Sequence, residues 1–477
     1  MQIRTTDKKL KALPKDYVRV DFVEKGAETL MREGKATTLT VALGKEKDLS
    51  PRTFRTLVRS VVQAAHRHKI MKLAFSFELS NYPKLAQHGE AWALSQIAEN
   101  LLLADYAFTN YKSKPGRERL TEVLIAGKFT KEGLAGLRRG VTVGKAANAC
   151  RDIANTPGGD MTPKTLAERA KEELTGTKAT VTVLDEKAIR ELGMGGVLGV
   201  GQGAADKPRF IVIEYWGLKK PMMTGAKGAM KFKDDERPIV FVGKGVTFDT
   251  GGLQVKPGMA MYEMHMDMSG GAAVIAAIGA IARLGLQKNV VGLVPAVENA
   301  VSDRAIRPGD VLRLMSGKTV DVLHTDAEGR IILADALTYA KRYEPKLLVD
   351  VATLTGAAMV AVGQHAHVIM TKDRALEDRF RELGELSGDY TFPLPLWDEY
   401  LQYTKGVHGD IANVPSTGDS RAGGAINGGT FLSHFAEKMP WVHIDMAARM
   451  TSVASDKLAR GATGEPTRLL VKIAEEF

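Results

Sequence analysis

A chain of 477 residues is too long for one ordinary core, and its 44% hydrophobic and 26% charged residues exclude a disordered protein. Cys150 is the only cysteine, which excludes an intrachain disulfide, and the longest weakly polar run, residues 270–282, is too short to cross a membrane. The first residues show no apolar signal segment, so we expect a cytoplasmic protein of two domains without a membrane partner.

The net charge of +10 is concentrated at one end of the chain. Residues 1–150 contain 27 Lys and Arg against 15 Asp and Glu, whereas the remainder is nearly balanced. Such a surplus is typical of a surface that binds nucleic acid or another polyanion. A solvated basic face that keeps the protein in solution also explains it, and we favour that interpretation.

Residues 1–156 are expected to form a small, basic α/β domain that ends in a linker helix. Ser50 and Pro51 are a helix cap and a first-turn residue, so a helix is expected to begin there. The predicted strands are 37–43, 71–78 and 121–127, and the predicted helices are 51–66, 91–111 and 130–153. A turn-forming run at 155–159 marks the break before a second domain, which is expected to span 157–477.

The second domain is expected to alternate strands and helices around one sheet. Helices are predicted at 162–174, 188–194, 268–284, 330–342 and 373–384, and strands at 179–185, 210–216, 238–244, 289–297, 319–323, 346–353, 366–371 and 441–446. We therefore predict an α/β fold whose larger C-terminal domain has a central mixed, largely parallel sheet with helices on both faces. The glycine-rich run 193–204 is expected to form tight turns, and residues 218–237 a surface insertion.

Polar residues follow three of the predicted strands. Lys244 ends the strand 238–244, Asp326 comes shortly after 319–323, and Thr353 ends 346–353. Ligand sites in sheets of this kind form beyond the carboxyl ends of the strands. These residues are therefore expected to meet at one edge of the sheet.

Four carboxylates belong to the same region, namely those of Asp249, Asp267, Asp326 and Glu328. If the chain is extended after Asp326, the side chains of Asp326, Glu328 and Arg330 point to one side. Four free anions cannot share a partly buried site, and divalent metals resolve the conflict, with Mg, Mn or Zn suited to oxygen ligands. Four carboxylates suffice to bridge two ions roughly 3.5–4 Å apart, as in two-metal hydrolases.

Two lysines and two glycines accompany the carboxylates. Lys244 and Lys256 can ligate a metal after losing a proton, or polarise a carbonyl while charged. Gly251 and Gly252 allow a sharp turn after Asp249. Ordinary salt bridges at loop ends are the alternative, and spacing does not decide between phosphate-ester and peptide hydrolysis.

The same segments resemble the leucyl (cytosol) aminopeptidase family, whose members use two metals, zinc or manganese, and are typically hexameric. The resemblance covers most of residues 90–475. VGKGVTFDTGG and HTDAEGRIILADAL match the two main segments of the family. RDIANTPGGDMTP, RAIRPGDVLRLMSGKTV, VDVATLTGA, WVHIDMAA and GATGEPTRLLV follow in the order of the family.

The resemblance implies a role for each charged residue. Lys244, Asp249, Asp267 and Glu328 would hold a tight metal, zinc or manganese. Asp249 and Glu328 would also bridge to an exchangeable metal, which is zinc, manganese, magnesium or cobalt and is completed by Asp326. The free α-amino group of a peptide would bind the exchangeable metal.

The resemblance also implies the catalytic and substrate-binding residues. Lys256 would steady the substrate carbonyl, and Arg330 would hold a bicarbonate ion that acts as general base. The expected apolar pocket for the N-terminal side chain consists of Met264, Thr353, Leu354, Gly356, Ala447 and Met450. Methionine adapts its shape, so broad acceptance of leucine-like residues is expected.

His324 stands where the family usually has asparagine. Because it lies two residues before Asp326, it can touch the site or tune its pH response. We favour a supporting hydrogen bond in place of the asparagine.

The resemblance predicts a metal-dependent aminopeptidase acting on peptides, as a homohexamer. Two alternatives differ in class. One is a DNA-binding, architectural role of the basic N-terminal domain, which some bacterial relatives of the family have. The other is an oligomeric scaffold that binds no metal.

Overall fold

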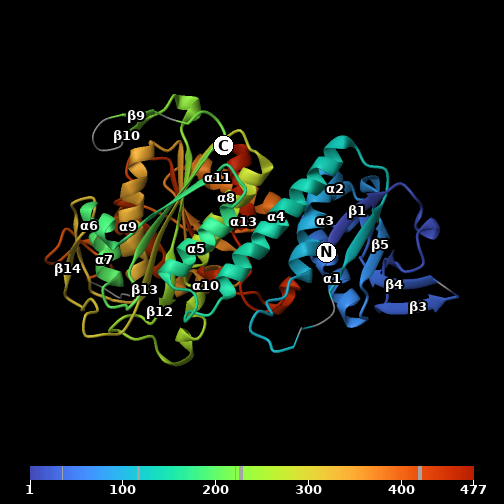
Figure 1. Cartoon of the computed structure of the whole chain (residues 1–477), viewed down its shortest axis with the longest axis horizontal. Coiled ribbons are helices and arrows are strands. Elements are labelled where there is room, and N and C mark those ends of the chain that lie inside the picture. Colours follow the sequence, from blue (N-terminus) through green and yellow to red (C-terminus); the bar gives the residue numbers. More distant parts are fainter. Residues whose placement is uncertain (35, 115, 117–118, 221, 225–228, 417–421) are drawn as a thin grey trace. The chain divides into compact units, whose positions relative to one another are not determined.

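The computed structural model describes residues 1–477 apart from 35, 115, 117–118, 221, 225–228 and 417–421 (Figure 1). The chain divides into two compact units, of which the first comprises residues 1–148 with 452–460 and the second comprises 149–451 with 461–477. The chain enters the second unit inside helix α4 (Lys131–Asn155). The domain bounds 1–156 and 157–477 remain a proposal about parts that fold independently.

The first unit is built on a six-stranded sheet in the order β1-β6-β5-β2-β4-β3. Its strands are β1 (Gln2–Thr6), β2 (Val18–Val23), β3 (Thr29–Glu33), β4 (Ala36–Ala42), β5 (Lys72–Ser76) and β6 (Glu122–Ala126). The predictions at 37–43, 71–78 and 121–127 are confirmed as β4, β5 and β6. Strands β1 to β3 were not predicted. β3 is wholly exposed and β1 is mostly polar, whereas β2 was missed although Val18, Val20 and Phe22 alternate with polar residues.

Helices α1 (Pro51–Arg67) and α3 (Glu90–Asp105) pack on each other through a ladder of polar contacts. Ser50 caps α1 by accepting a hydrogen bond from the N–H of Thr53, as its sequence predicts. Helix α3 ends at Asp105, before the predicted end at 111, because the backbone turns to an extended conformation at Tyr106; the Asp105 carboxylate accepts the backbone N–H of Leu120.

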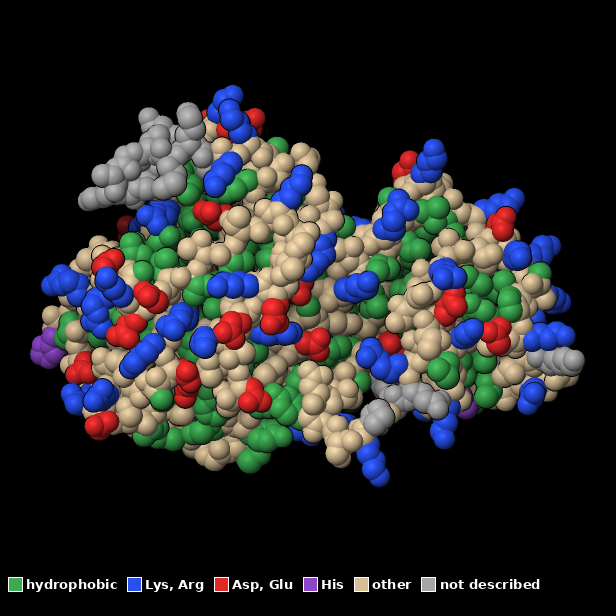
Figure 2. All heavy atoms as spheres, viewed as in Figure 1, with side chains coloured by type: hydrophobic (Ala, Val, Ile, Leu, Met, Phe, Trp, Pro, Cys, Tyr) green, Lys and Arg blue, Asp and Glu red, His purple; other side chains and the backbone are tan. Residues whose placement is uncertain are grey.

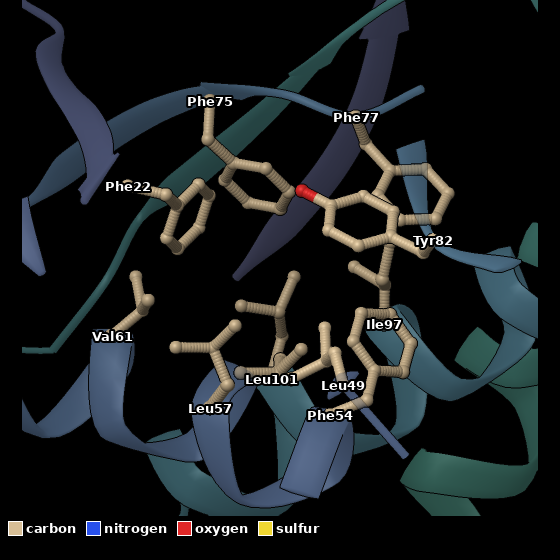
Figure 3. A pocket seen from close by; sticks show the side chains of 11 residues that line it. Phe22, Leu49, Phe54, Leu57, Val61, Phe75, Phe77, Tyr82, Ile97 and Leu101 are labelled. Carbon is tan, nitrogen blue, oxygen red and sulfur yellow. The ribbon is translucent and has the colours of Figure 1, made fainter. Parts of the chain in front are cut away.

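Aromatic and aliphatic side chains fill the core between α1, α3 and the sheet. Phe77 stacks on both Phe54 and Tyr82, with ring centroids 5.9 and 5.6 Å apart. Figure 3 shows Phe75 and Phe77 facing Leu57 and Leu101 across a small cavity of about 20 Å³. Its lining is apolar apart from the Tyr82 hydroxyl, so this cavity belongs to the core.

The second unit is organised around a nine-stranded sheet in the order β18-β17-β20-β16-β11-β13-β8-β7, with β12 paired to β13. The strands are β7 (Thr180–Leu184), β8 (Arg209–Trp216), β11 (Ile239–Gly243), β12 (Gly245–Asp249), β13 (Asn289–Asn299), β16 (Leu347–Ala352), β17 (His367–Met370), β18 (Thr391–Pro393) and β20 (Trp441–Asp445). The neighbours β20, β16, β11 and β13 are all parallel, whereas β7, β8 and β17 pair antiparallel. The predicted mixed, largely parallel sheet is confirmed.

Helices cover both faces of this sheet (Figure 1). One face carries α5 (Pro163–Leu174), α8 (Ser269–Leu284) and α13 (Thr467–Glu476), and the other carries α7 (Gly195–Gly201), α9 (Glu328–Ala340) and α12 (Gly424–Ser433). The remaining helices are α2 (Pro83–Ala86), α6 (Glu186–Glu191), α10 (Gly356–Val362) and α11 (Arg374–Ser387). The stretch Gly258–Leu284 is long and apolar enough to span a membrane, but 83% of its 18-residue apolar window is buried within the protein, as in a core helix.

The tight turns predicted at 193–204 are wrong, because residues 195–201 form helix α7. The glycines of α7 serve close packing. A Cβ on Gly195 would lie 2.0 Å from the carbonyl oxygen of Arg313, and one on Gly196 would lie 2.6 Å from that of Ile331. Within 218–237, β9 (Met222–Thr224) and β10 (Ala229–Lys231) form a hairpin, and its turn lies outside the described residues.

The strand predicted at 319–323 is outside the central sheet. Residues Thr319–Asp321 form β15, which joins β14 (Val311–Arg313) and β19 (Ile411–Ala412) in a separate three-stranded sheet. The Asp321 carboxylate accepts the backbone N–H groups of residues 407–409, which fixes the loop before β19.

Candidate active site

The carboxyl ends of the parallel strands carry the first group of site residues. Lys244 follows β11, and Thr353 follows β16, its hydrogen-bonded neighbour. Asp445 ends β20 and accepts the backbone N–H groups of Leu354 and Ala447. The sheet edge therefore positions these residues, as the strand pattern predicts.

Glycines let the elements approach closely enough to build the site. A Cβ on Gly270, at the start of α8, would lie 2.2 Å from the carbonyl oxygen of Val351 in β16. Helix α8 therefore packs closely on the sheet at this point. Gly251 and Gly252 have φ values of +87° and +66°, so the sharp turn predicted after Asp249 is also confirmed.

The extended geometry predicted for Asp326 to Arg330 is wrong. Residues 325–326 form a turn, and Glu328 and Arg330 lie in the first turn of α9. The side chains of Glu328 and Arg330 still face the site, because the preceding turn directs the first residues of α9 toward it. A negative Glu328 at the N-terminus of a helix is also favoured by the helix dipole.

Two lysine ammonium groups lie between the four carboxylates. Lys244 Nζ is 2.8 Å from Asp267 Oδ2 and 2.8 Å from Glu328 Oε1, and it also donates to the carbonyl oxygen of Thr353 at 3.1 Å. Lys256 Nζ is 2.8 Å from Asp249 Oδ2 and 2.5 Å from Asp326 Oδ1. The cluster is almost wholly buried, with only Lys256 and Asp326 partly exposed.

This crowding shifts the protonation of the carboxyl groups. Burial raises the pKa of Asp267 to about 7 and that of Asp326 to about 6, and it also raises the pKa of Glu328. Asp249 differs, because burial is outweighed there by Lys256 and Lys244, which lower its pKa. Burial opposes the charge on Lys244, but Asp267 and Glu328 outweigh it and raise the lysine pKa.

Several carboxylate oxygens have unused acceptor capacity. Asp267 Oδ2, Asp326 Oδ1 and Glu328 Oε1 are near a lysine, yet within the described part of the chain none accepts a hydrogen bond of good geometry. Carboxylate oxygens of Asp249, Asp326 and Glu328 lie within 4.8 Å of one another. Buried acceptors gathered in this way are suited to a cation.

The pocket above this cluster has a volume of about 640 Å³. It brings together all the predicted site residues except Glu328, which lies beneath Lys244. The predicted members of its lining are Lys244, Asp249, Lys256, Met264, Asp267, His324, Asp326, Arg330, Thr353, Leu354, Gly356, Ala447 and Met450. Val414 and Pro415, from the loop after β19, also line it.

Two buried asparagines hold the loops of the site in place, and neither was predicted from the sequence. Asn299 donates to Asp249 Oδ1 at 2.8 Å and to the carbonyl oxygen of Thr325 at 3.1 Å. Asn413 accepts the N–H of Leu323 at 2.8 Å and donates to the carbonyl oxygen of His324 at 2.6 Å. Asn299 ends β13, so the rule about strand ends could have found it, but Asn413 lies in a loop without such a signal.

Comparisons with known proteins agree on one family. Residues 148–471 match the family described as "Cytosol aminopeptidase family, catalytic domain", and residues 31–115 match its N-terminal domain. Probable cytosol aminopeptidases from Roseiflexus castenholzii and Methylobacillus flagellatus are 40% and 38% identical, each over 92% of this chain and over 87% and 84% of their own lengths.

Solved structures give the same answer. A mutant of tomato leucine aminopeptidase is 26% identical with a TM-score of 0.86, covering 100% of this chain and 97% of its own. The bottromycin maturation enzyme BotP in complex with Mn is 29% identical with a TM-score of 0.84, covering 97% and 99%. The chain therefore belongs to the cytosol aminopeptidase family and is a peptide hydrolase.

Proposed function

We propose that the chain is a two-metal aminopeptidase that removes leucine-like residues from the N-terminus of peptides. The observation that carries this proposal is the buried cluster of four carboxylates and two lysines on the floor of one pocket. Aminopeptidase activity agrees with the family. The two metals, a bicarbonate ion and the preference for leucine-like residues are the finer parts of the proposal.

The donor set fits two divalent cations. Four carboxylates exceed the two lysines by two negative charges, and three of their oxygens have unused acceptor capacity. We assign Lys244, Asp249, Asp267 and Glu328 to one ion, and Asp249, Asp326 and Glu328 to an exchangeable one. Oxygen-rich ligation suits manganese, zinc, magnesium or cobalt, and BotP is a structural neighbour that holds Mn. When bound, such ions supply Lewis-acid polarisation of a carbonyl and activation of water.

Lys256 is proposed to steady the substrate carbonyl. Although burial opposes its charge, Asp249, Glu328 and Asp326 raise its pKa, so the side chain is a charged donor at neutral pH. It is also partly exposed to the pocket, whereas Lys244 is buried. A charged donor beside the reacting carbonyl favours the developing negative oxygen of the transition state.

Arg330 is proposed to hold an anion, bicarbonate, that acts as general base. Its guanidinium is 6% exposed and lines the pocket, and its Nη1 donates to the carbonyl oxygen of Asn413 at 2.6 Å. Its Nε has no partner among the described residues, and burial lowers its pKa to about 10. A buried, incompletely paired guanidinium is a fitting partner for a small planar anion.

The N-terminal side chain of the peptide is proposed to occupy the apolar part of the pocket. Its residues are Met264, Thr353, Leu354, Gly356, Ala447 and Met450. Two methionines and no charged group in this set favour aliphatic side chains over charged ones. The Thr353 hydroxyl already donates a hydrogen bond to Asp267 Oδ1, at 2.6 Å, so it adds little polarity to the pocket.

The test combines metal analysis with hydrolysis of a leucyl-anilide. The purified protein should contain manganese or zinc, lose activity with a chelator and regain it with either ion. Asp326→Ala and Lys256→Ala should abolish turnover without unfolding, and Asp303→Ala, at an exposed aspartate outside the pocket, should not. An enzyme that is indifferent to chelation would refute the two-metal proposal, and activity in either pocket variant would refute that residue's role.

We also propose that the protein is a cytoplasmic homohexamer. The catalytic unit exposes large apolar side chains, among them Met259 at 78%, Tyr262 at 63% and Val360 at 88%, and methionine and aromatic side chains are enriched at protein interfaces. Light scattering on the purified chain, with a subunit mass of 51.7 kDa, should give six subunits. A stable, fully active monomer would contradict the proposal.

DNA binding is a second candidate, and the charge of residues 1–150 favours it. Lys and Arg side chains are spread across the face of the N-terminal unit seen in Figure 2. Phosphate contacts would make the affinity fall steeply with salt. A gel-shift titration at rising salt is the test. If the DNA is not retarded even at low salt, this role is refuted.

A further inference from the structure

Two short helices supply part of the proposed side-chain pocket. Helix α10 begins with Gly356, and the 3₁₀-helix η9 (Ala447–Arg449) begins with Ala447 and is followed by Met450. The two helices pack on each other. The distance between them therefore helps to set how large a side chain the pocket can accept.

The side chain of Arg449 fastens η9 to the segment that follows α10. It is 3% exposed, and its Nη1 donates to the carbonyl oxygen of Gln364, two residues after α10, at 2.6 Å. The backbone of η9 is held as well, because the carbonyl oxygen of Arg449 accepts the hydroxyl of Thr463 at 2.6 Å. Arg449 thus joins two segments that both contribute to the pocket.

Glu465 fixes the direction of the Arg449 guanidinium. Arg449 Nε and Nη2 donate to the two carboxylate oxygens of Glu465, at 3.2 and 2.7 Å. Such a fork fixes the plane of the guanidinium as well as its position. Burial opposes the charge on Glu465, but Arg449 outweighs it and holds the pKa of that carboxyl well below its ordinary value. The pair is therefore ionised at neutral pH.

We propose that Arg449 is a positioning residue that sets the width of the side-chain pocket by tying η9 to the end of α10. This inference rests on the proposed function, because it uses the proposed side-chain pocket. Without the tie, η9 and α10 can separate, and the pocket accepts larger side chains. The alternative is an ordinary buried ion pair that only stabilises the fold.

A second buried ion pair in the same unit provides a matched control. Arg449→Lys keeps a positive charge for Glu465 but lacks the planar fork that holds two partners at once. Arg468 is 2% exposed and also holds two partners, Asp389 Oδ1 at 2.8 Å and the carbonyl oxygen of Gly388 at 2.9 Å. Arg449→Lys and Arg468→Lys both remove a buried fork, but only Arg449 belongs to η9.

The first readout is the ratio of kcat/KM for a leucyl-anilide to that for a phenylalanyl-anilide. Arg449→Lys should lower this ratio about three- to tenfold without loss of metal, because small changes of fit in an apolar pocket are worth about this much. Arg468→Lys should leave it within twofold of the original. A ratio within twofold of the original in Arg449→Lys overturns the proposal, and so does an equal fall in both variants.

The second readout needs no turnover. Hydrogen exchange of the backbone amides of residues 447–450, followed by mass spectrometry, should be faster in Arg449→Lys and unchanged in Arg468→Lys. Unchanged exchange in Arg449→Lys overturns the proposal. Wild-type protein that hydrolyses neither anilide would refute the proposed function instead, and the exchange rates would still show whether Arg449 holds η9.

A double variant covers the case in which Arg449→Lys does not fold. Arg449→Met combined with Glu465→Gln leaves neither charge of the pair unpaired, and replacing both members of a buried ion pair is often tolerated. The same ratio and the same exchange rates are then measured on this variant. A lower ratio with faster exchange at residues 447–450 supports the proposal, and wild-type values of either overturn it.

Discussion

Adding one methyl group at Gly329 should disable the site without removing any functional group. Gly329 lies between Glu328 and Arg330 in the first turn of α9. A Cβ built there would lie 2.6 Å from Lys244 Cε and 2.7 Å from its Nζ. Ordinary contacts are about 3.5–4.0 Å, so Lys244 has to retreat by about 1 Å.

Lysine is usually flexible, but Lys244 has little freedom to move. It is 3% exposed, and its ammonium group is shared by Asp267, Glu328 and the carbonyl oxygen of Thr353. Overpacking of this kind costs about 1–3 kcal/mol of unfolding free energy. A misplacement of about 1 Å in an active site costs roughly 100-fold in rate.

The assay is kcat/KM on a leucyl-anilide together with metal content and urea unfolding of Gly329→Ala. Gly159→Ala is the matched control, because a Cβ at Gly159 would meet no atom within 4 Å. We expect roughly 100-fold lower kcat/KM for Gly329→Ala and little change for the control. If Gly329→Ala has the same activity, metal content and stability as the wild-type protein, then Lys244 does not need its present position.

Four further predictions concern protons and packing. Because Asp267 and Asp326 must be deprotonated to bind a cation, metal affinity in calorimetric titrations should fall as pH decreases through about 7 to 6, and a flat profile would contradict these pKa values. In the metal-free protein, the raised pKa values of Asp267 and Asp326 also increase the free energy of unfolding at pH values below 3.8, the ordinary carboxyl pKa. Urea unfolding should show that this contribution is lost as the pH rises through 6 to 7. Asn413→Ala should lower the unfolding free energy by about 2–4 kcal/mol because it strands buried backbone groups, and Asn413→Asp should not restore it, because a buried carboxylate would face the carbonyl oxygen of His324; an unchanged urea midpoint in Asn413→Ala would refute this role. Gly196→Ala should cost about 1–3 kcal/mol by forcing α7 away from Ile331, and an unchanged urea midpoint would show that α7 can shift freely.

The charged part of the site was predictable because buried charge is costly and is therefore concentrated where function needs it. Lys244 could be placed at a strand end because the apolar run before it is long, and the turn after Asp249 could be predicted because its glycines are explicit. Local shape was less predictable. The start of α9 at Glu328 depends on contacts of the preceding turn, and α7 forms from glycines that sequence patterns assign to turns.

The supporting amides were the least predictable part, for a physical reason. Asn413 acts through hydrogen bonds to the backbone of residues 90 positions away, and such bonds impose no residue pattern near either partner. Asp321 fixes the loop before β19 in the same way, by accepting three backbone N–H groups. Polar residues that serve distant backbone become visible only once the fold brings the loops together.

The two lysines explain how the fold can close over four carboxylates without a metal. Lys244 and Lys256 leave two net negative charges, and these are the charges that protons on Asp267 and Asp326 remove near pH 6. The metal-free cluster is then close to neutral, so burying it is not prohibitive. Divalent cations, if they bind as proposed, would have to displace both protons and part of the lysine contacts. Folding and metal binding would then be separable steps, with the lysines holding the carboxylates in place in the metal-free protein.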